Sequence, residues 1–167
     1  MQVTSIETRY YSGLMGGRTV LADDIKEDWS TSVWVSDDSL LLGGRLHTAN
    51  IHRAYGTTRL AHVALVAMLR ERREIFNIGI GLGISNGIVG ARFPDAHLVN
   101  VDYSPAVLYF IRRYADYNSH LLEQEHNEVR ITDGRLALLR DKNTYDLITE
   151  LGNQDGYPGA STIKSVE

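Results

Sequence analysis

Residues 74–83 read EIFNIGIGLG, and this stretch decides the fold. Its apolar run predicts a buried strand, its glycines predict a tight turn, and residues 85–92 continue as a helix until Pro94. Glycines here let a ligand approach the backbone just before helix amides begin. The spacing G-x-G-x-G, with Ile84 where a dinucleotide pattern needs a small residue, favours a nucleoside with a thioether tail over a pyrophosphate. A turn with a purely structural role remains the alternative.

Strands and helices alternate on the carboxyl side of this stretch. Short apolar runs predict strands over residues 97–102, 128–132 and 145–149. Helices are expected after Ser104-Pro105, which offer an N-cap and a first helical residue, and over residues 136–139. On the amino side, apolar residues at helical spacing predict a further helix from Thr57. This order predicts an α/β fold with a parallel, doubly wound sheet.

The amino-terminal third has a different pattern. Residues 18–22, 32–36 and 39–42 are short and rich in β-branched or large apolar residues, which is typical of strands. Gly43-Gly44 then supplies the positive φ angles of a two-residue hairpin turn. We therefore expect an antiparallel β-hairpin region over residues 1–56, followed by the nucleoside-binding α/β domain over residues 57–167.

Acidic residues follow two of the predicted parallel strands. Asp102 lies 19 residues beyond Gly83, close to the ~20 at which an acid reaches both hydroxyls of a ribose. Asp133 follows the next strand, where a carboxylate can accept a hydrogen bond from the exocyclic amine of adenine. Helix capping by Asp102 and an ordinary Asp-Gly turn at Asp133 remain alternatives. Because carboxyl ends of parallel strands meet at one edge, the glycine turn and both acids predict one ligand site.

Composition excludes several classes of function. Hydrophobic residues make up 43% and charged residues 23%, as in an ordinary globular protein, and the net charge of −4 disfavours nucleic acid as a partner. The absence of cysteine rules out thiol chemistry, and the histidines form no compact metal signature. No apolar run approaches the ~20 residues that a bilayer needs, so we expect a cytoplasmic protein without a membrane or metal partner.

From Ile75 to Glu150 the chain resembles the S-adenosylmethionine-dependent methyltransferase fold, and most closely the spermidine synthase-like aminopropyltransferases. The resemblance extends to residues 40–47, which read LLLGGRLH, to residues 60–65, and to Asp133-Gly134-Arg135. It implies a Rossmann-like domain after a β-hairpin region, with decarboxylated S-adenosylmethionine or S-adenosylmethionine as co-substrate. By resemblance, the nucleoside and its thioether would be held by Gly79, Gly81, Gly83 and Asp102, and the adenine by Asp133.

The chain departs from the family at the positions that bind the amine. His47 stands where the family has a cofactor-contacting glutamine, and residues 56–58 read GTT where it has a Tyr-His-Glu run for the polyamine. Aminopropyl transfer needs a carboxylate that positions the amine and takes up its proton. Glu150 and Asp155, near the family's catalytic segment, are the candidates for that role.

The family sheet has seven strands in the order 3-2-1-4-5-7-6, and the sequence supplies only the first four. Residues 145–149 would then form an open, apolar edge. We therefore expect either that a partner such as a second copy covers this edge, or that the chain is a piece of a longer protein. Three functions stay open: aminopropyl transfer to a polyamine, methyl transfer from S-adenosylmethionine, and a catalytically silent module for adenosyl-ligand binding or interaction.

Overall fold

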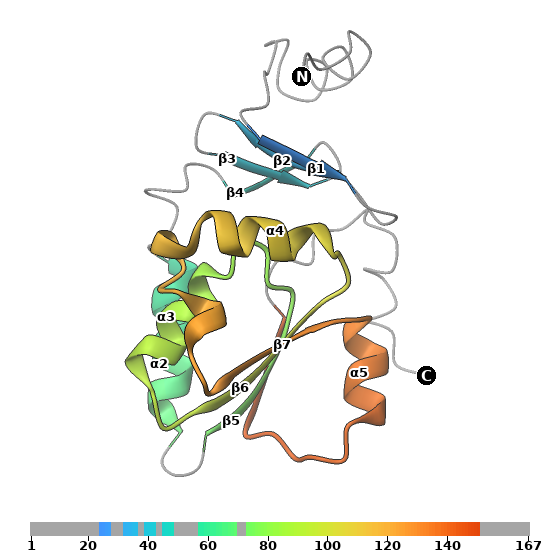
Figure 1. The fold of residues 1–167 in the computed structure, drawn as a ribbon. Coiled ribbons are helices and arrows are strands. Elements are labelled where there is room, and N and C mark those ends of the chain that lie inside the picture. Colours follow the sequence, from blue (N-terminus) through green and yellow to red (C-terminus); the bar gives the residue numbers. More distant parts are fainter. Residues whose placement is uncertain are drawn as a thin grey trace, which may run out of the picture. The chain divides into compact units, whose positions relative to one another are not determined.

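The computed structural model describes residues 24–27, 32–36, 39–42, 45–48, 57–69 and 73–150. The chain divides into two compact units, Met1–Tyr55 and Gly56–Glu167. Figure 1 gives the elements of both units along the chain. In the described part, no helix is both long enough and apolar enough to cross a lipid bilayer.

The first unit contains a four-stranded antiparallel sheet with neighbours in chain order. Its strands are β1 (Asp24–Glu27), β2 (Ser32–Ser36), β3 (Ser39–Leu42) and β4 (Arg45–Thr48). Leu42 pairs with Arg45, so two residues connect β3 to β4, as the Gly43-Gly44 pair predicts. The sequence did not predict β1, and the strand predicted over residues 18–22 lies outside the described residues.

The second unit contains a four-stranded parallel sheet in the order β7-β6-β5-β8. The strands are β5 (Glu74–Ile78), β6 (His97–Asp102), β7 (Asn127–Ile131) and β8 (Leu147–Glu150). Every adjacent pair is parallel, and in chain order the sheet reads 3-2-1-4. The predicted α/β class and parallel sheet are therefore confirmed, with β5 and β6 in the centre.

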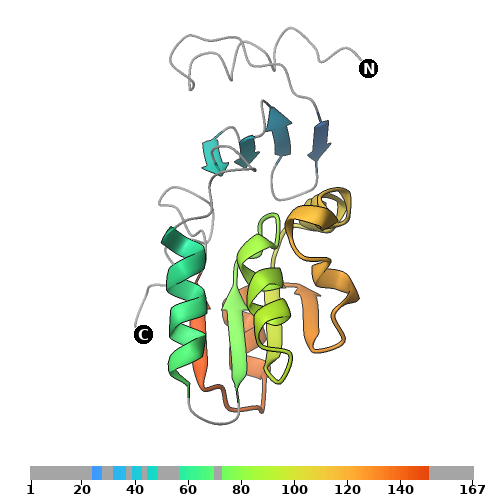
Figure 2. The ribbon, with the colours of Figure 1, turned by 90° about the vertical axis from the view of Figure 1, so that its left-hand side faces the viewer.

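Helices cover both faces of the parallel sheet. One face carries α2 (Thr57–Met68) and α3 (Ile84–Arg92), and the other carries α5 (Gly134–Arg140), as Figures 1 and 2 show from two sides. The α2 and α3 face buries a cluster of Val66, Ile75, Val89, Ala96 and Leu98. The opposite face buries Phe76, Val99 and Val101 against residues of α5 and Tyr145. Alternate residues of each strand thus enter different cores.

The chain between β6 and β7 packs on α3. It contains α4 (Ala106–Arg113) and two short 3-10 turns, η1 (Ala115–Tyr117) and η2 (Leu121–Glu123). The apolar face predicted for α4 is confirmed, because Val107, Phe110 and Ile111 are buried. Gly87 allows the close approach: a Cβ there would lie 1.7 Å from the carbonyl oxygen of Asn118. The segment between β6 and β7 thus packs closely against α3, the helix that follows the glycine turn.

One predicted strand begins later than its sequence indicates. The apolar pattern starts at Tyr145, whereas β8 starts at Leu147. Asp146, just before β8, bonds to the first residue of β5. Its carboxylate accepts from the Glu74 amide at 2.8 Å, and its own amide donates to the Glu74 carbonyl at 2.8 Å. The Tyr145 ring packs edge-on against Phe76, with ring centroids 5.0 Å apart.

Candidate functional site

The turn after β5 depends on its three glycines. Gly79, Gly81 and Gly83 have φ angles of 88°, 56° and 76°, in the left-handed region that side chains rarely adopt. The Gly83 amide donates to the Ile80 carbonyl at 2.8 Å, which closes the turn. The Gly83 carbonyl accepts from the Gly87 amide, and this bond begins α3. The backbone amides of residues 80 and 81 are thereby turned toward the end of β6.

Asp102, the last residue of β6, binds this turn directly. Its Oδ2 accepts hydrogen bonds from the amides of Ile80 at 2.9 Å and Gly81 at 3.3 Å, and its Oδ1 accepts from the Ser104 amide at 3.0 Å. The half-buried carboxylate and the glycine turn therefore lie together, as the sequence predicted. Pro105 stands at the N-cap of α4 and makes no side-chain capping bond, so the capping role predicted for the Ser104 side chain stays a prediction.

Asp133 follows β7 and caps the helix after it. Its Oδ1 accepts from the amide of Leu136 at 2.8 Å, so it is the N-cap of α5. The Asp133 side chain thus makes a local capping contact, and the residue is exposed. Gly134 then passes close to β5, because a Cβ there would lie 2.6 Å from Cγ2 of Ile78. The adenine role of Asp133 stays a prediction.

Glu150 is the last residue of β8 and is exposed. It pairs in register with Ile78, the residue before the glycine turn, so it lies at the carboxyl edge of the sheet. Of the other predicted site residues, Asp155 lies outside the described residues. His47 belongs to β4 of the first unit, and its side chain is also outside the described part.

The sequence reasoning missed a row of buried polar residues under this edge. Asn77 and Asn100 are fully buried in the central strands, and their side chains bond to each other at 2.8 Å. Each lies two residues before a site residue, Gly79 or Asp102. The available signal was an asparagine inside each of two apolar runs, EIFNI and HLVNVD.

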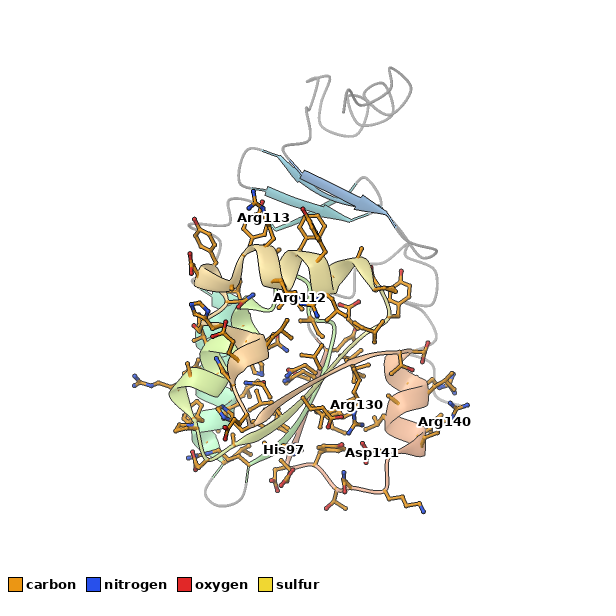
Figure 3. The ribbon with its side chains drawn as sticks, viewed as in Figure 1. His97, Arg112, Arg113, Arg130, Arg140 and Asp141 are labelled. Atoms are coloured by element: carbon orange, nitrogen blue, oxygen red, sulfur yellow. The ribbon has the colours of Figure 1, made fainter. Side chains whose placement is uncertain are left out.

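A second charged cluster lies on the α5 side of the sheet, between β7 and the end of α5. Arg130 binds both carboxylate oxygens of Glu128 at 2.7 and 2.8 Å and one oxygen of Asp141 at 2.7 Å. Figure 3 shows Arg130 and Asp141 side by side near the end of α5. The Tyr145 hydroxyl and then Arg130 hold the pKa of Asp141 well below its usual range. Burial, aided by the hydrogen bond to Asp141, raises the pKa of Tyr145 to about 12.

These contacts connect β7 to Asp141 at the end of α5 and to Tyr145, so the cluster is structural. Its charged groups bond to one another, on the face of the sheet that α5 covers. Within the described ranges, no group of three or more histidine, aspartate or glutamate side chains could hold a metal ion.

The fold resembles that of solved spermidine synthases. One, in complex with the transition-state analogue AdoDATO, matches with a TM-score of 0.66 and 17% identity over 79% of this chain and 48% of its own. The enzyme from Thermotoga maritima gives 0.66 and 18% over 78% of this chain and 46% of its own. A probable spermidine synthase from Corynebacterium glutamicum gives 0.60 and 12% over 78% and 51%.

At these identities the likeness concerns the fold: the chain has a spermidine synthase-like, methyltransferase-like α/β fold and spans about half the length of the structures it matches. No protein-family model and no curated protein matches its sequence.

Proposed function

We propose that the carboxyl edge of β5 and β6 binds the adenosyl part of decarboxylated S-adenosylmethionine or a related adenosyl thioether. One observation carries the proposal: the Asp102 carboxylate is bonded to the amides of the glycine turn. A nucleoside site needs an acid that accepts from the sugar hydroxyls and a glycine-rich turn that lets the ligand approach the backbone. The fold shared with spermidine synthases, one of them bound to AdoDATO, supports the same ligand class.

The bonds of Asp102 limit how a ribose can bind. A carboxylate offers about four acceptor positions, and three are taken by the amides of Ile80, Gly81 and Ser104. Two ribose hydroxyls would need two positions. We expect the ligand to use the remaining position and to displace the Gly81 amide, whose 3.3 Å bond is the longest of the three.

For the reaction, we propose aminopropyl transfer to a polyamine, with Glu150 as the carboxylate that receives the amine's proton. A neutral amine attacks the propyl carbon beside the sulfonium and a C–N bond forms. The C–S bond breaks and its electron pair neutralises the sulfur, which leaves methylthioadenosine. The exposed position of Glu150 at the same sheet edge supports this assignment. Asp155 is the second candidate for this role.

Calorimetry with methylthioadenosine tests the binding step. Asp102→Asn should weaken binding about 10- to 100-fold, because a hydrogen bond to a charged group contributes about 1.5–3 kcal/mol. Asp116→Asn removes an equally negative but exposed side chain of η1 and should leave the affinity unchanged. Equal affinities for wild type and Asp102→Asn, or no binding by the wild type, would contradict the proposed site.

Release of methylthioadenosine from decarboxylated S-adenosylmethionine and putrescine tests the reaction. Glu150→Gln should bind the nucleoside normally and lose turnover. Binding without any product in the wild type would favour the silent module. Tighter binding of S-adenosylmethionine than of its decarboxylated form would favour methyl transfer.

A further inference from the structure

A row of polar side chains crosses the buried centre of the parallel sheet. Thr149 of β8, Asn77 of β5 and Asn100 of β6 are neighbours in register, and all three are buried. They share the face of Ile75 and Leu98, which α2 and α3 cover. We call Thr149, Asn77 and Asn100 the amide ladder.

Hydrogen bonds join the ladder from strand to strand. The Thr149 hydroxyl donates to Oδ1 of Asn77, and Nδ2 of Asn77 donates to Oδ1 of Asn100 at 2.8 Å. The same oxygen of Asn100 accepts from Nδ2 of Asn86, in the first turn of α3, at 2.7 Å. On its other side, Nδ2 of Asn100 donates to Oδ1 of Asn127 at 2.8 Å and to the Glu128 carbonyl at 3.3 Å.

Such a row is unusual for its surroundings. Strands of a parallel sheet covered on both faces are ordinarily continuous apolar runs, and buried polar groups cost free energy unless every one is bonded. Asn100 makes four hydrogen bonds, so the ladder meets that condition at its centre. Bonds with fixed donors and acceptors specify relative positions more narrowly than apolar contacts do, because apolar contacts lack direction.

The ladder lies directly behind the candidate site. Asn77 precedes Gly79 by two residues, Asn100 precedes Asp102 by two, and Thr149 immediately precedes Glu150. Asn86 connects the same row to the helix that follows the glycine turn. Hydrogen bonds therefore join β5, β6 and β8 to one another within two residues of their carboxyl ends, and they join β6 to the third residue of α3.

We propose that the amide ladder positions the glycine turn against the Asp102 carboxylate, so that its members are positioning residues of the nucleoside site. The consequence for ligand affinity rests on the proposed function. The consequence for the turn itself does not, because the bonds from Ile80 and Gly81 to Asp102 exist without ligand.

The test variant is Asn77→Leu, which keeps the branched shape and removes the central bonds. It leaves Oδ1 of Asn100 bonded to Asn86, and the freed Thr149 hydroxyl can rotate, so the damage to the core is small. Thr149→Val removes one donor and serves as a milder variant if Asn77→Leu does not fold. The matched control is Val99→Ala, which destabilises the opposite face of β6 without touching the ladder.

Two measurements follow, amide hydrogen exchange by NMR and the Kd for methylthioadenosine. In Asn77→Leu, the Ile80 and Gly81 amides should exchange about tenfold faster relative to the Leu98 amide, and the Kd should rise about tenfold. Thr149→Val should give smaller changes in the same direction. The double variant should match Asn77→Leu, because Thr149 acts through Asn77. Val99→Ala should lower the melting temperature and change neither measurement.

Exchange ratios and Kd within about twofold of wild type in Asn77→Leu would overturn the proposal. Equal changes in Val99→Ala at the same loss of melting temperature would also overturn it, because they would reflect stability alone. If the wild type does not bind methylthioadenosine, the proposed function fails and the exchange measurement still decides the role of the ladder. If only Thr149→Val folds, its exchange ratios decide in the same way.

Discussion

Gly87→Ala should destabilise the protein strongly, although alanine is the better helix former. The added Cβ would lie 1.7 Å from the carbonyl oxygen and 2.7 Å from the carbonyl carbon of Asn118. Asn118 cannot easily withdraw, because its fully buried side chain donates to the carbonyls of Leu82 at 3.0 Å and Ile111 at 2.8 Å and accepts from the Leu121 amide at 3.1 Å.

The size of the effect follows from these contacts. Moving Asn118 by more than an ångström would break its three hydrogen bonds, at about 1 kcal/mol each, and overpacking adds about 1–3 kcal/mol. The gain in helix propensity returns about 1 kcal/mol. The net loss is about 3–5 kcal/mol, or roughly 6–20 °C in melting temperature for a chain of this size.

Gly90→Ala is the matched control, in the same helix and with the same propensity gain. The three atoms nearest to its Cβ would be side-chain ends: Nδ2 of Asn127 and Oε1 of Gln124, each at 2.1 Å, and Nε2 of His126 at 3.1 Å. Moving these ends apart would break the one hydrogen bond between them, so with overpacking and the propensity gain the loss should be about 1–3 kcal/mol. Urea unfolding followed by circular dichroism measures both variants. A Gly87→Ala protein as stable as wild type, or no less stable than Gly90→Ala, would refute the reasoning.

Two further predictions concern pH. His62 of α2 is 2% exposed, and burial lowers its pKa, an effect that the nearby Asn77 side chain partly opposes. Below about pH 6.5 the unfolded chain therefore binds a proton that the folded chain does not, so stability should fall from pH 7 to 5 in the wild type and much less in His62→Leu; parallel melting curves would contradict this. The pKa of Asp141 is depressed by Tyr145 and Arg130, so its stabilisation is present above its unfolded pKa of about 3.9 and is lost as pH falls below it. Asp141→Asn should cost about 1–2 kcal/mol at pH 7 in urea unfolding, with a difference that shrinks from pH 4 to 2; a constant difference would count against the assignment.

The order of elements could be predicted because the spacing of apolar residues and the positions of glycine and proline indicate the same boundaries along the chain. The run EIFNI breaks into glycines, and Pro94 ends the next helix, so strand, turn and helix each have a signal of their own. The start of β8 could not be predicted in this way. Asp146 bonds to Glu74, a residue 72 positions away, and no local pattern reports that contact.

The candidate site was predictable in part for the same reason. Strand ends meet at one edge of a parallel sheet, so Asp102 and the glycine turn were expected together, and the structure brings them into hydrogen-bond contact. That backbone amides already occupy the carboxylate was not predictable, because it depends on the three positive φ angles of the turn. The ladder was missed because a single asparagine in a strand does not reveal which residue is its neighbour in register.

The occupied carboxylate changes what the binding experiments measure. If Asp102 were unbonded without ligand, ribose would add its hydrogen bonds to a site held by other contacts. Instead, the ligand replaces the bond from the Gly81 amide with bonds from its ribose hydroxyls. The net free energy of binding from this carboxylate is therefore a difference between bonds of similar strength. Asp102→Asn should therefore lower stability and affinity together, because one carboxylate serves the turn and the ligand. If the amide ladder positions the turn, Asn77→Leu should leave the carboxylate in place and alter where the turn presents its amides. If that variant loses affinity without a proportional loss of stability, the affinity depends on where the turn holds its amides. It would then not depend only on how stable the turn is.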